Sequence, residues 1–338
     1  MNLQQLLEDV KNTSGIKQKT EIQSIAHALK HARANPDYPN GDDAAVVKRD
    51  DGGYDLLVGE GFLSEFVETD PWFAGWCGVM VNVSDIVAMG GRPCAITNTL
   101  WSNDSEQCAH IFNGMSEASK VFNVPIVGGH TNLRSSNSQL AVSIFGRANA
   151  LLSSFNARPG DALVTAIDLR GEFRAPFLNW NAATTAPIER LRGDIELLPT
   201  IAEQQLAHSA KDISQAGLLG TSLMLFESSH VGATINLENI PKPEHVAWLD
   251  WLCCFPSFGY LLTTPMNKLD QLLESFDERN ISAAQIGQIT AEPLVQISYQ
   301  NQTECFWDIA TTPVTGMTPT AQTSTPKQIT TPKEASYA

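Results

Sequence analysis

The stretch from Asp70 to Gly91 restricts the fold more than any other part of the sequence. It opens with Asp70-Pro71, a favourable pair for the N-cap and first position of a helix. Apolar side chains then recur at helical spacing, at Phe73, Trp76, Cys77, Met80, Val83 and Val87. Gly90-Gly91 ends the pattern. The sequence therefore predicts a helix over 71–89 whose apolar stripe belongs to a core.

Strands and helices surround this segment in mixed order. Five segments have strand character: 41–47, 54–58, 95–100, 124–127 and 139–148. The first two flank Asp50-Asp51-Gly52-Gly53, which indicates a hairpin turn. Further helices are expected over 18–32 and 104–122, the second opened by Asp104 as in a capping box. Hairpins mixed with helices favour an α+β domain, here 1–152, over a doubly wound parallel sheet.

The rest of the chain indicates a second domain, 153–310, and a tail. Arg158-Pro159-Gly160-Asp161 is a turn that leads into this domain. Its expected helices are 187–207, 215–229, 243–254 and 267–279, and its expected strands are 162–166, 231–237, 258–264 and 283–299. Residues 311–338 are rich in Thr, Pro, Ser and Gln. Because they offer few large apolar side chains, we expect a disordered, dispensable tail.

Charge and composition argue against several functions. The 338 residues include 22 Lys and Arg against 37 Asp and Glu, a formal charge of −15 with no basic run, which argues against nucleic-acid binding. No stretch approaches about 20 consecutive apolar residues, and the first nine residues lack the pattern of a signal peptide. We therefore expect a cytoplasmic protein without membrane contact. The six cysteines show no metal-binding spacing and are expected to be buried apolar residues in a reducing compartment.

The common nucleotide-binding loops are missing. The sequence has no G-x-x-x-x-G-K-[ST], and no G-x-G-x-x-G between a strand and a helix. A nucleotide would then be held through metal-bound phosphates, and Mg²⁺ takes carboxylate oxygens for this purpose. Asp42 and Asp43 are candidates, since a glycine and a strand of small residues flank them. A solvated turn before the strand is the alternative.

Asp85 is a stronger candidate because of its place near the C-terminal end of the 71–89 helix. The helix dipole disfavours an anion there by ~0.3–1 kcal/mol, and a nearby cation would remove that penalty. Asn82, three residues earlier, lies on the same face and could share the ligand. The alternative is that Asp85 points to solvent or caps a neighbouring loop.

Two other segments could bind phosphate. Gly128-Gly129-His130-Thr131 follows an apolar strand, where a glycine turn would expose backbone N–H groups, although a plain tight turn is the alternative. Arg134 and Arg147 would suit phosphate through bidentate hydrogen bonds. Ser214 is expected to be the N-cap of the helix that follows Lys211-Asp212-Ile213, where helix N–H groups attract anions or are simply capped.

Taken in order, these segments resemble the family of aminoimidazole ribonucleotide (AIR) synthetase, thiamine-monophosphate kinase, selenophosphate synthetase and the hydrogenase-maturation protein HypE. Residues 41–46 and 82–90 look most like the kinase, 89–93 and 128–131 are nearer to selenophosphate synthetase, and 158–161 with 212–219 match the second domain. The likeness spans about residues 40 to 300.

The resemblance implies a two-domain, PurM-like α+β fold. In this family the N-terminal mixed-sheet domain pairs with its copy to form a β-barrel across a homodimer, and a C-terminal α/β sandwich domain follows. ATP and Mg²⁺ are the implied cofactors, and a small-molecule acceptor is the implied partner. The family transfers a phosphoryl group or activates an oxygen by phosphorylating it, so catalysis depends on positioning and charge neutralisation.

Site residues are implied by the same resemblance. Asp43 and Asp85 correspond to Mg²⁺ ligands, with Asp42 as a partner, and Glu60 stands where the kinases have an aspartate. His130 replaces a further aspartate, and we expect it to contact phosphate or acceptor because Mg²⁺ prefers oxygen to imidazole. The expected catalytic residues are Asp212 and His130; the expected cofactor-binding residues are Asn82, Gly128, Gly129, Thr131, Arg134 and Arg147.

The predicted function is therefore an ATP-dependent, kinase-like or ligase-like enzyme, with thiamine-monophosphate kinase as the closest named activity. A selenophosphate synthetase-like or AIR synthetase-like ligase is an alternative. A nucleotide-binding partner protein without turnover is the alternative from another class.

Overall fold

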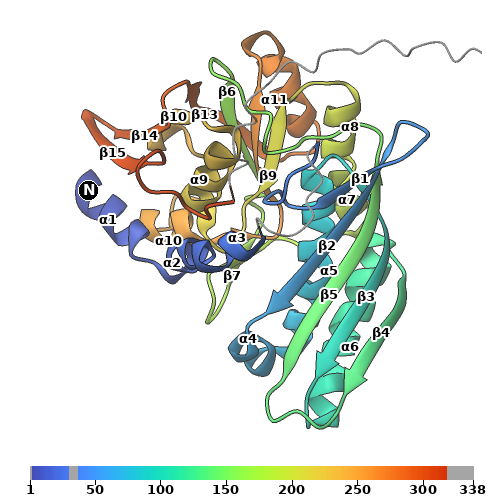
Figure 1. Ribbon diagram of the computed structural model, residues 1–338. Coiled ribbons are helices and arrows are strands. Elements are labelled where there is room, and N and C mark those ends of the chain that lie inside the picture. The colour runs from blue at the N-terminus through green and yellow to red at the C-terminus, as the bar shows by residue number, and fades with distance from the viewer. Residues whose placement is uncertain (1, 30–36, 318–338) are drawn as a thin grey trace, which may run out of the picture.

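Residues 2–29 and 37–317 are described by the computed structural model, and they form two domains built on separate sheets (Figure 1). The first domain contains a five-stranded sheet in the order β1-β2-β5-β3-β4. Its strands are β1 (Ala45–Lys48), β2 (Tyr54–Phe62), β3 (Arg92–Trp101), β4 (Ile126–Asn132) and β5 (Gln139–Ala148). All neighbouring pairs are antiparallel except β3 with β4. The mixed sheet and its first hairpin were expected from the sequence.

Helices α4 (Ser64–Thr69), α5 (Pro71–Ala88) and α6 (Ser105–Phe122) complete the first domain. α5 begins as predicted, because the Asp70 side chain accepts a hydrogen bond from the Phe73 N–H, and it ends before Gly90, whose φ is +77°. It packs between the sheet and α6 (Figure 1). The two helices approach so closely that a Cβ on Gly114 would lie 1.9 Å from the Trp72 carbonyl oxygen.

The second domain is built on a seven-stranded sheet in the order β15-β14-β10-β13-β6-β12-β9. Its strands are β6 (Ala162–Ile167), β9 (Ser209–Asp212), β10 (Gly232–Asn236), β12 (Gly259–Thr264), β13 (Ser282–Thr290), β14 (Leu294–Tyr299) and β15 (Gln302–Asp308). Strand β6 is buried on both faces: Leu163 and Ile167 enter one hydrophobic core, and Val164 and Ala166 enter another. That other core continues into the first domain around α5, which therefore lies between the two sheets.

Short helices and a small sheet surround the second domain. The helices are α7 (Ile188–Asp194), α8 (Leu197–Glu203), α9 (Gly217–Ser229), α10 (Trp248–Cys253) and α11 (Leu269–Asp277), with 3₁₀ turns at Leu237–Asn239 and Met266–Lys268. The small sheet has the order β11-β8-β7, from β7 (Glu172–Arg174), β8 (Asn179–Asn181) and β11 (Phe255–Pro256). No helix among residues 2–29 and 37–317 has the length and apolar character needed to cross a membrane.

The N-terminal helices pack on the second domain, although the sequence grouped them with 1–152. They are α1 (Leu3–Lys11), α2 (Ser14–Glu21) and α3 (Gln23–Leu29). Leu7 and Ile16 belong to the same hydrophobic core as Leu218. The Leu3 N–H also donates to Gln302 Oε1 at 3.1 Å. Figure 1 shows α1 beside β15. The grouping by sequence was wrong because chain order does not reveal which core an amphipathic helix covers.

Several expected elements are divided. The helix expected over 18–32 separates into α2 and α3 at Ile22, and its residues 30–32 lie outside the described ranges. The one expected over 187–207 separates into α7 and α8. The strand expected over 283–299 is two strands, because β10 lies between β13 and β14 in the sheet. Helix α1, strand β15 and the small sheet were not predicted.

The first part of the expected tail is docked. Val314 is only 1% exposed and lies in the core of the second domain. The buried carboxylate of Glu227, on α9, accepts hydrogen bonds from the N–H groups of Val314, Thr315 and Gly316 and from Thr315 Oγ1. The prediction that the tail starts at 311 was therefore wrong for 311–317, since hydrogen bonds to one anion compensate for scarce apolar contacts. Residues 318–338 lie outside the described part of the chain.

Candidate metal centre

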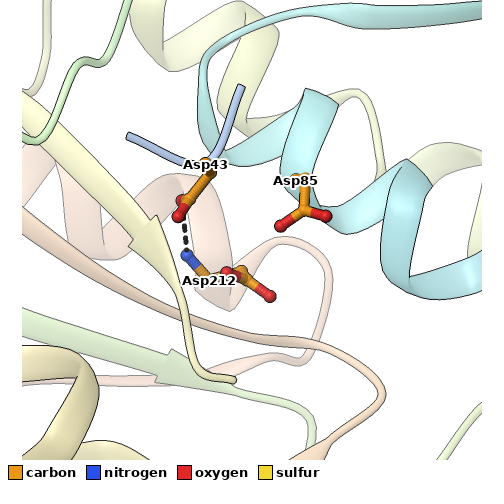
Figure 2. A group of neighbouring side chains, drawn as sticks. All are labelled: Asp43, Asp85 and Asp212. Carbon is orange, nitrogen blue, oxygen red and sulfur yellow. Dashed lines mark hydrogen bonds between the residues drawn. The ribbon is translucent and has the colours of Figure 1, made fainter. Parts of the chain in front are cut away.

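Three aspartates from distant parts of the sequence meet between the two sheets. Asp43 precedes β1, Asp85 lies in the last turn of α5, and Asp212 ends β9. Each offers a carboxylate oxygen, and these oxygens all lie within 4.8 Å of one another (Figure 2). We call these three residues the acidic cluster. The fold forms it because α5 is held between the first sheet and β9.

Asp85 is buried without enough partners. It is 5% exposed, and its Oδ2 accepts no hydrogen bond from the described residues. One turn earlier, Asn82 donates through Nδ2 to the Gly78 carbonyl at 2.8 Å, while its buried Oδ1 also has no partner in the described chain. Since a buried polar atom without a hydrogen bond is costly, these two oxygens indicate room for a cation or ordered water. Asp85 does not point to solvent.

Asp43 is fixed on both of its oxygens. Lys211 Nζ donates to Asp43 Oδ1, and the Asp212 N–H donates to Oδ2 at 3.2 Å (Figure 2). The side chains of Asp43 and Lys211 are 5% and 6% exposed. Lys211 therefore belongs to the site, a role that the sequence did not assign.

The surroundings of the acidic cluster disfavour the charged forms of its three carboxyl groups. Burial, followed by the charges of Asp212, Glu60 and Asp43, raises the pKa of Asp85 well above its ordinary value. Burial and then Asp43 raise the pKa of Asp212 to about 8, although Lys211 acts in the opposite direction. Burial also raises the pKa of Asp43 against the lowering effect of Lys211. A divalent cation would remove this conflict by favouring all three charged forms.

These groups fit Mg²⁺ in both chemistry and number. Mg²⁺ binds hard oxygen ligands and uses one or two carboxylates together with water or phosphate oxygens. Asp85 and Asp212 can supply such carboxylates, Asn82 Oδ1 is an unused oxygen on the same helix, and Asp43 lies beside them. The donor set contains no His or Cys, which argues against a preference for softer metals.

Glu60 on β2 lies at the edge of the acidic cluster. Its charge raises the pKa of both Asp85 and Asp212. Its own pKa is raised by burial, with Lys19 lowering it and Asp43 raising it. Lys19 of α2 thus acts on the site from a helix that the sequence did not connect with it. The metal group in the described residues consists of Asp43, Asp85 and Asp212, so a role for Glu60 at the metal stays a prediction.

Asp42 has a different role from the expected one. Both of its oxygens accept hydrogen bonds from the segment after β5: Ser153 Oγ at 2.6 Å, Ser154 Oγ at 2.7 Å and the Ser154 N–H at 3.1 Å. The Asp42 carboxylate therefore anchors the loop that contains Asp43 to the segment that links the two domains. This occupation leaves it outside the acidic cluster.

The residues expected to bind phosphate around 128–131 lie elsewhere. Gly128, Gly129, His130 and Thr131 form part of strand β4 and not a turn, because they pair in register with β3. The pairing across the sheet runs from Glu60 on β2, through β5 and β3, to Gly129 on β4. Three inter-strand spacings, about 14 Å, therefore separate Glu60 from Gly129. Within one chain, His130 therefore does not reach the acidic cluster.

The two arginines and Ser214 also differ from expectation. Arg134 follows the exposed edge strand β4, and Arg147 on β5 pairs with Asp55 on β2 at 3.3 Å. Ser214 does not cap α9: the helix starts at Gly217, whose φ of +68° places a turn before it. The Ser214 Oγ is buried and has no hydrogen-bond partner in the described chain.

Comparison with known proteins agrees with both domains. Residues 41–148 match the family model described as AIR synthase related protein, N-terminal domain, and residues 180–300 match its C-terminal counterpart. An uncharacterized protein of Synechocystis, sll0787, is 41% identical over 94% of this chain and 99% of its own length. The thiamine-monophosphate kinase of Pyrococcus abyssi is 31% identical over 69% of this chain and 79% of its own length.

Solved structures share the fold. Thermotoga maritima PurL complexed with ADP has a TM-score of 0.69 at 23% identity, over 86% of this chain and 50% of the PurL chain. This chain thus spans about half the length of PurL. A chain of the HypE-HypF complex has a TM-score of 0.65 at 23% identity, over 83% of this chain and 98% of its own length. The expected two-domain PurM-like α+β fold is confirmed.

Proposed function

Because the chain belongs to the AIR synthase related family, we propose that it is an ATP- and Mg²⁺-dependent enzyme that phosphorylates a small-molecule acceptor or activates it by phosphorylation. Two thiamine-monophosphate kinases, 31% and 28% identical, support phosphoryl transfer as the reaction class. PurL, which shares the fold, is known with ADP and with ATP.

The acidic cluster is the observation that carries this proposal. Asp85 and Asp212 would hold Mg²⁺, with Asp43 next to them and with Asn82 and Glu60 as further oxygen donors. When bound, Mg²⁺ would supply neutralisation of the charge on the transferred phosphoryl group. Asp212 was expected to be catalytic, but its place in the cluster favours metal binding. Lys211 and the Asp212 N–H keep Asp43 oriented.

No role is proposed for the residues that lie away from the cluster. These are Gly128, Gly129, His130, Thr131, Arg134 and Arg147. Asp42 is proposed as a positioning residue, because its hydrogen bonds to Ser153 and Ser154 fix the segment that carries Asp43.

We also propose a homodimer formed by the first sheet. Val47, Leu57 and Val127 are 51%, 51% and 63% exposed on its strands, so the sheet leaves large apolar side chains uncovered. Burying such side chains against a second copy would be favourable. Light scattering at micromolar concentration should give the mass of two chains; a monomer mass would contradict this part of the proposal.

The test of the site is Mg²⁺-dependent nucleotide binding. Asp85→Asn removes the charge of the residue with the unpartnered oxygen and should abolish Mg²⁺-dependent ATP binding in calorimetry while the fold is kept. Asp277→Asn, an exposed residue at the end of α11, is the matched control and should behave as the parent. Equal nucleotide affinity in the parent and Asp85→Asn would exclude the acidic cluster as the metal centre. Phosphate release with candidate acceptors then tests turnover.

A further inference from the structure

The ammonium of Lys211 lies inside the acidic cluster and not at its rim. Its side chain is 6% exposed, and Nζ donates to Asp43 Oδ1. The charges of Asp42 and Asp212 also attract it. Strand β9 holds the residue in place, because Lys211 is paired with Leu261 of β12 in the middle of the ladder.

This lysine changes the charge that a metal ion would meet. Three carboxylates and one ammonium leave a formal charge of −2, which one divalent cation matches. Within residues 2–29 and 37–317, no cationic nitrogen lies within 4.0 Å of a carboxylate oxygen of Asp85 or Asp212. Asp43 has both oxygens engaged, whereas Asp85 Oδ2 has no partner among the same residues. Asp85 and Asp212 are therefore the two residues whose carboxylate oxygens can coordinate a divalent cation.

We propose that Lys211 is a resident counter-ion that takes the place of a second divalent cation at Asp43, so that the centre binds a single divalent cation. The proposal rests on the proposed metal centre and goes beyond it by assigning a stoichiometry and a residue that sets it. An ammonium beside the cluster also repels a divalent cation, so Lys211 lowers the affinity for the ion that does bind. Glu60, at the edge of the cluster, adds negative charge but no competing cation.

A purely structural ion pair is the competing explanation. A buried carboxylate such as Asp43 needs a partner, and removing one member of a buried pair is destabilising whether or not a metal binds. The two explanations differ in metal binding: a structural pair affects folding stability alone, whereas a counter-ion also changes how many divalent ions bind and how tightly.

The experiment measures Mn²⁺ and Mg²⁺ binding to the full chain by calorimetry without nucleotide, and Mn²⁺ per chain by electron paramagnetic resonance. Lys211→Gln keeps a hydrogen-bond donor for Asp43 but removes the charge. We expect one ion per parent chain, two per Lys211→Gln chain, and first-ion affinity at least about tenfold tighter in the variant. Lys211→Arg keeps the charge and should bind as the parent does. Lys17→Met removes the same charge from an exposed position on α2 and is the control.

Each outcome decides between the explanations. One ion with parental affinity in Lys211→Gln would overturn the counter-ion role and leave the metal centre standing. No ion bound to either the parent or Lys211→Gln would overturn both proposals. If Lys211→Gln is unfolded in buffer, thermal denaturation with metal decides: recovery of folding by Mg²⁺ supports the counter-ion role, and its absence supports the structural pair.

Discussion

Two groups of buried aspartates in this molecule differ in the cations that surround them. The acidic cluster has Lys211 for its three carboxylates. A second group, which we call the arginine–aspartate network, consists of Asp168, Asp194, Arg170, Arg190 and Arg279. In it, Arg279 bonds Asp194 at 2.8 Å and Arg170 bonds Asp168 at 2.8 Å. The network has an excess of positive charge, whereas the cluster has an excess of negative charge.

This difference separates a structural use of buried carboxylates from a binding use. The network links α7 to the segments after β6 and α11, and it needs no added ion because three guanidinium groups face two carboxylates. The acidic cluster has one ammonium for three carboxylates, so an added cation would balance its charge. A buried carboxylate that lacks both a cation and enough hydrogen-bond donors is therefore a better guide to a ligand site than burial or a raised pKa alone.

The largest expected effect is the loss of stability when the network is broken. Asp194→Asn leaves Arg279 without its buried anion and leaves Arg190 with Asp168 alone, so we expect the free energy of unfolding to fall by about 3 kcal/mol. Urea denaturation in EDTA measures this, with Asp277→Asn as the exposed control. Mg²⁺ should not restore the loss. A decrease below about 1 kcal/mol would mean that the network is dispensable and would remove the contrast with the cluster.

Glu227 is a further buried carboxylate, stabilised by backbone N–H groups, and it gives the next effect. Truncation after Ala310 removes its partners at 314–316, so we expect a loss of about 2 kcal/mol, the scale of hydrogen bonds to a charged group. Truncation after Met317 keeps these bonds and is the control. Equal melting temperatures for the two truncated chains would show that the docked segment contributes nothing.

The metal-free protein is expected to lose stability as the pH rises from about 4 to about 8. The pKa of Asp212 rises to about 8 in the folded state, chiefly through burial and then Asp43, and that of Asp85 is raised as well. A carboxyl with a raised folded pKa contributes stability that is complete below its ordinary pKa and is lost as the pH passes through the folded value.

Urea unfolding at pH 5 and pH 8, in EDTA and in Mg²⁺, measures this dependence. Mg²⁺ should flatten it, because a bound cation favours the charged carboxylates. Asp85→Asn should reduce the slope in EDTA, whereas Asp277→Asn should not. Equal metal-free stability at the two pH values would contradict the excess negative charge on which the comparison depends.

Local signals allowed part of the site to be predicted from the sequence. The caps of α5 and its apolar spacing fixed the helix, and the helix dipole singled out Asp85. Asp43 was already a candidate because a glycine and a strand of small residues flank it, whereas the role of Asp212 came through the family resemblance. Lys211 was not predicted, since its partner Asp43 lies 168 residues away and no local pattern reports such a pair.

Other predictions failed because a motif was judged without its partner strand. A Gly-Gly pair suggests a turn, but pairing with β3 makes residues 128–131 a strand. Asp42 and Asp43 are adjacent and equivalent in the sequence, and only the position of Ser153 and Ser154 shows that they bind different things. Fold class can be predicted from periodicity in spite of such errors, whereas the prediction of a site depends on contacts between residues far apart in the sequence.

The smallest expected effects concern Glu60 and His130, the two positions that differ from the kinase pattern. Glu60 acts on Asp85 and Asp212 from the edge of the cluster, so Glu60→Gln should weaken Mg²⁺ binding about threefold, near the value of a solvent-screened charge interaction. His130 lies on β4, about 14 Å from Glu60 along the sheet. His130→Asp should therefore leave Mg²⁺ affinity unchanged, although the sequence suggested a contact with phosphate. Calorimetry on both variants decides, with Asp277→Asn as the control. A change of more than about threefold in His130→Asp would show that β4 reaches the metal centre. A second chain would have to supply that strand, and the complete site would then contain residues of two chains.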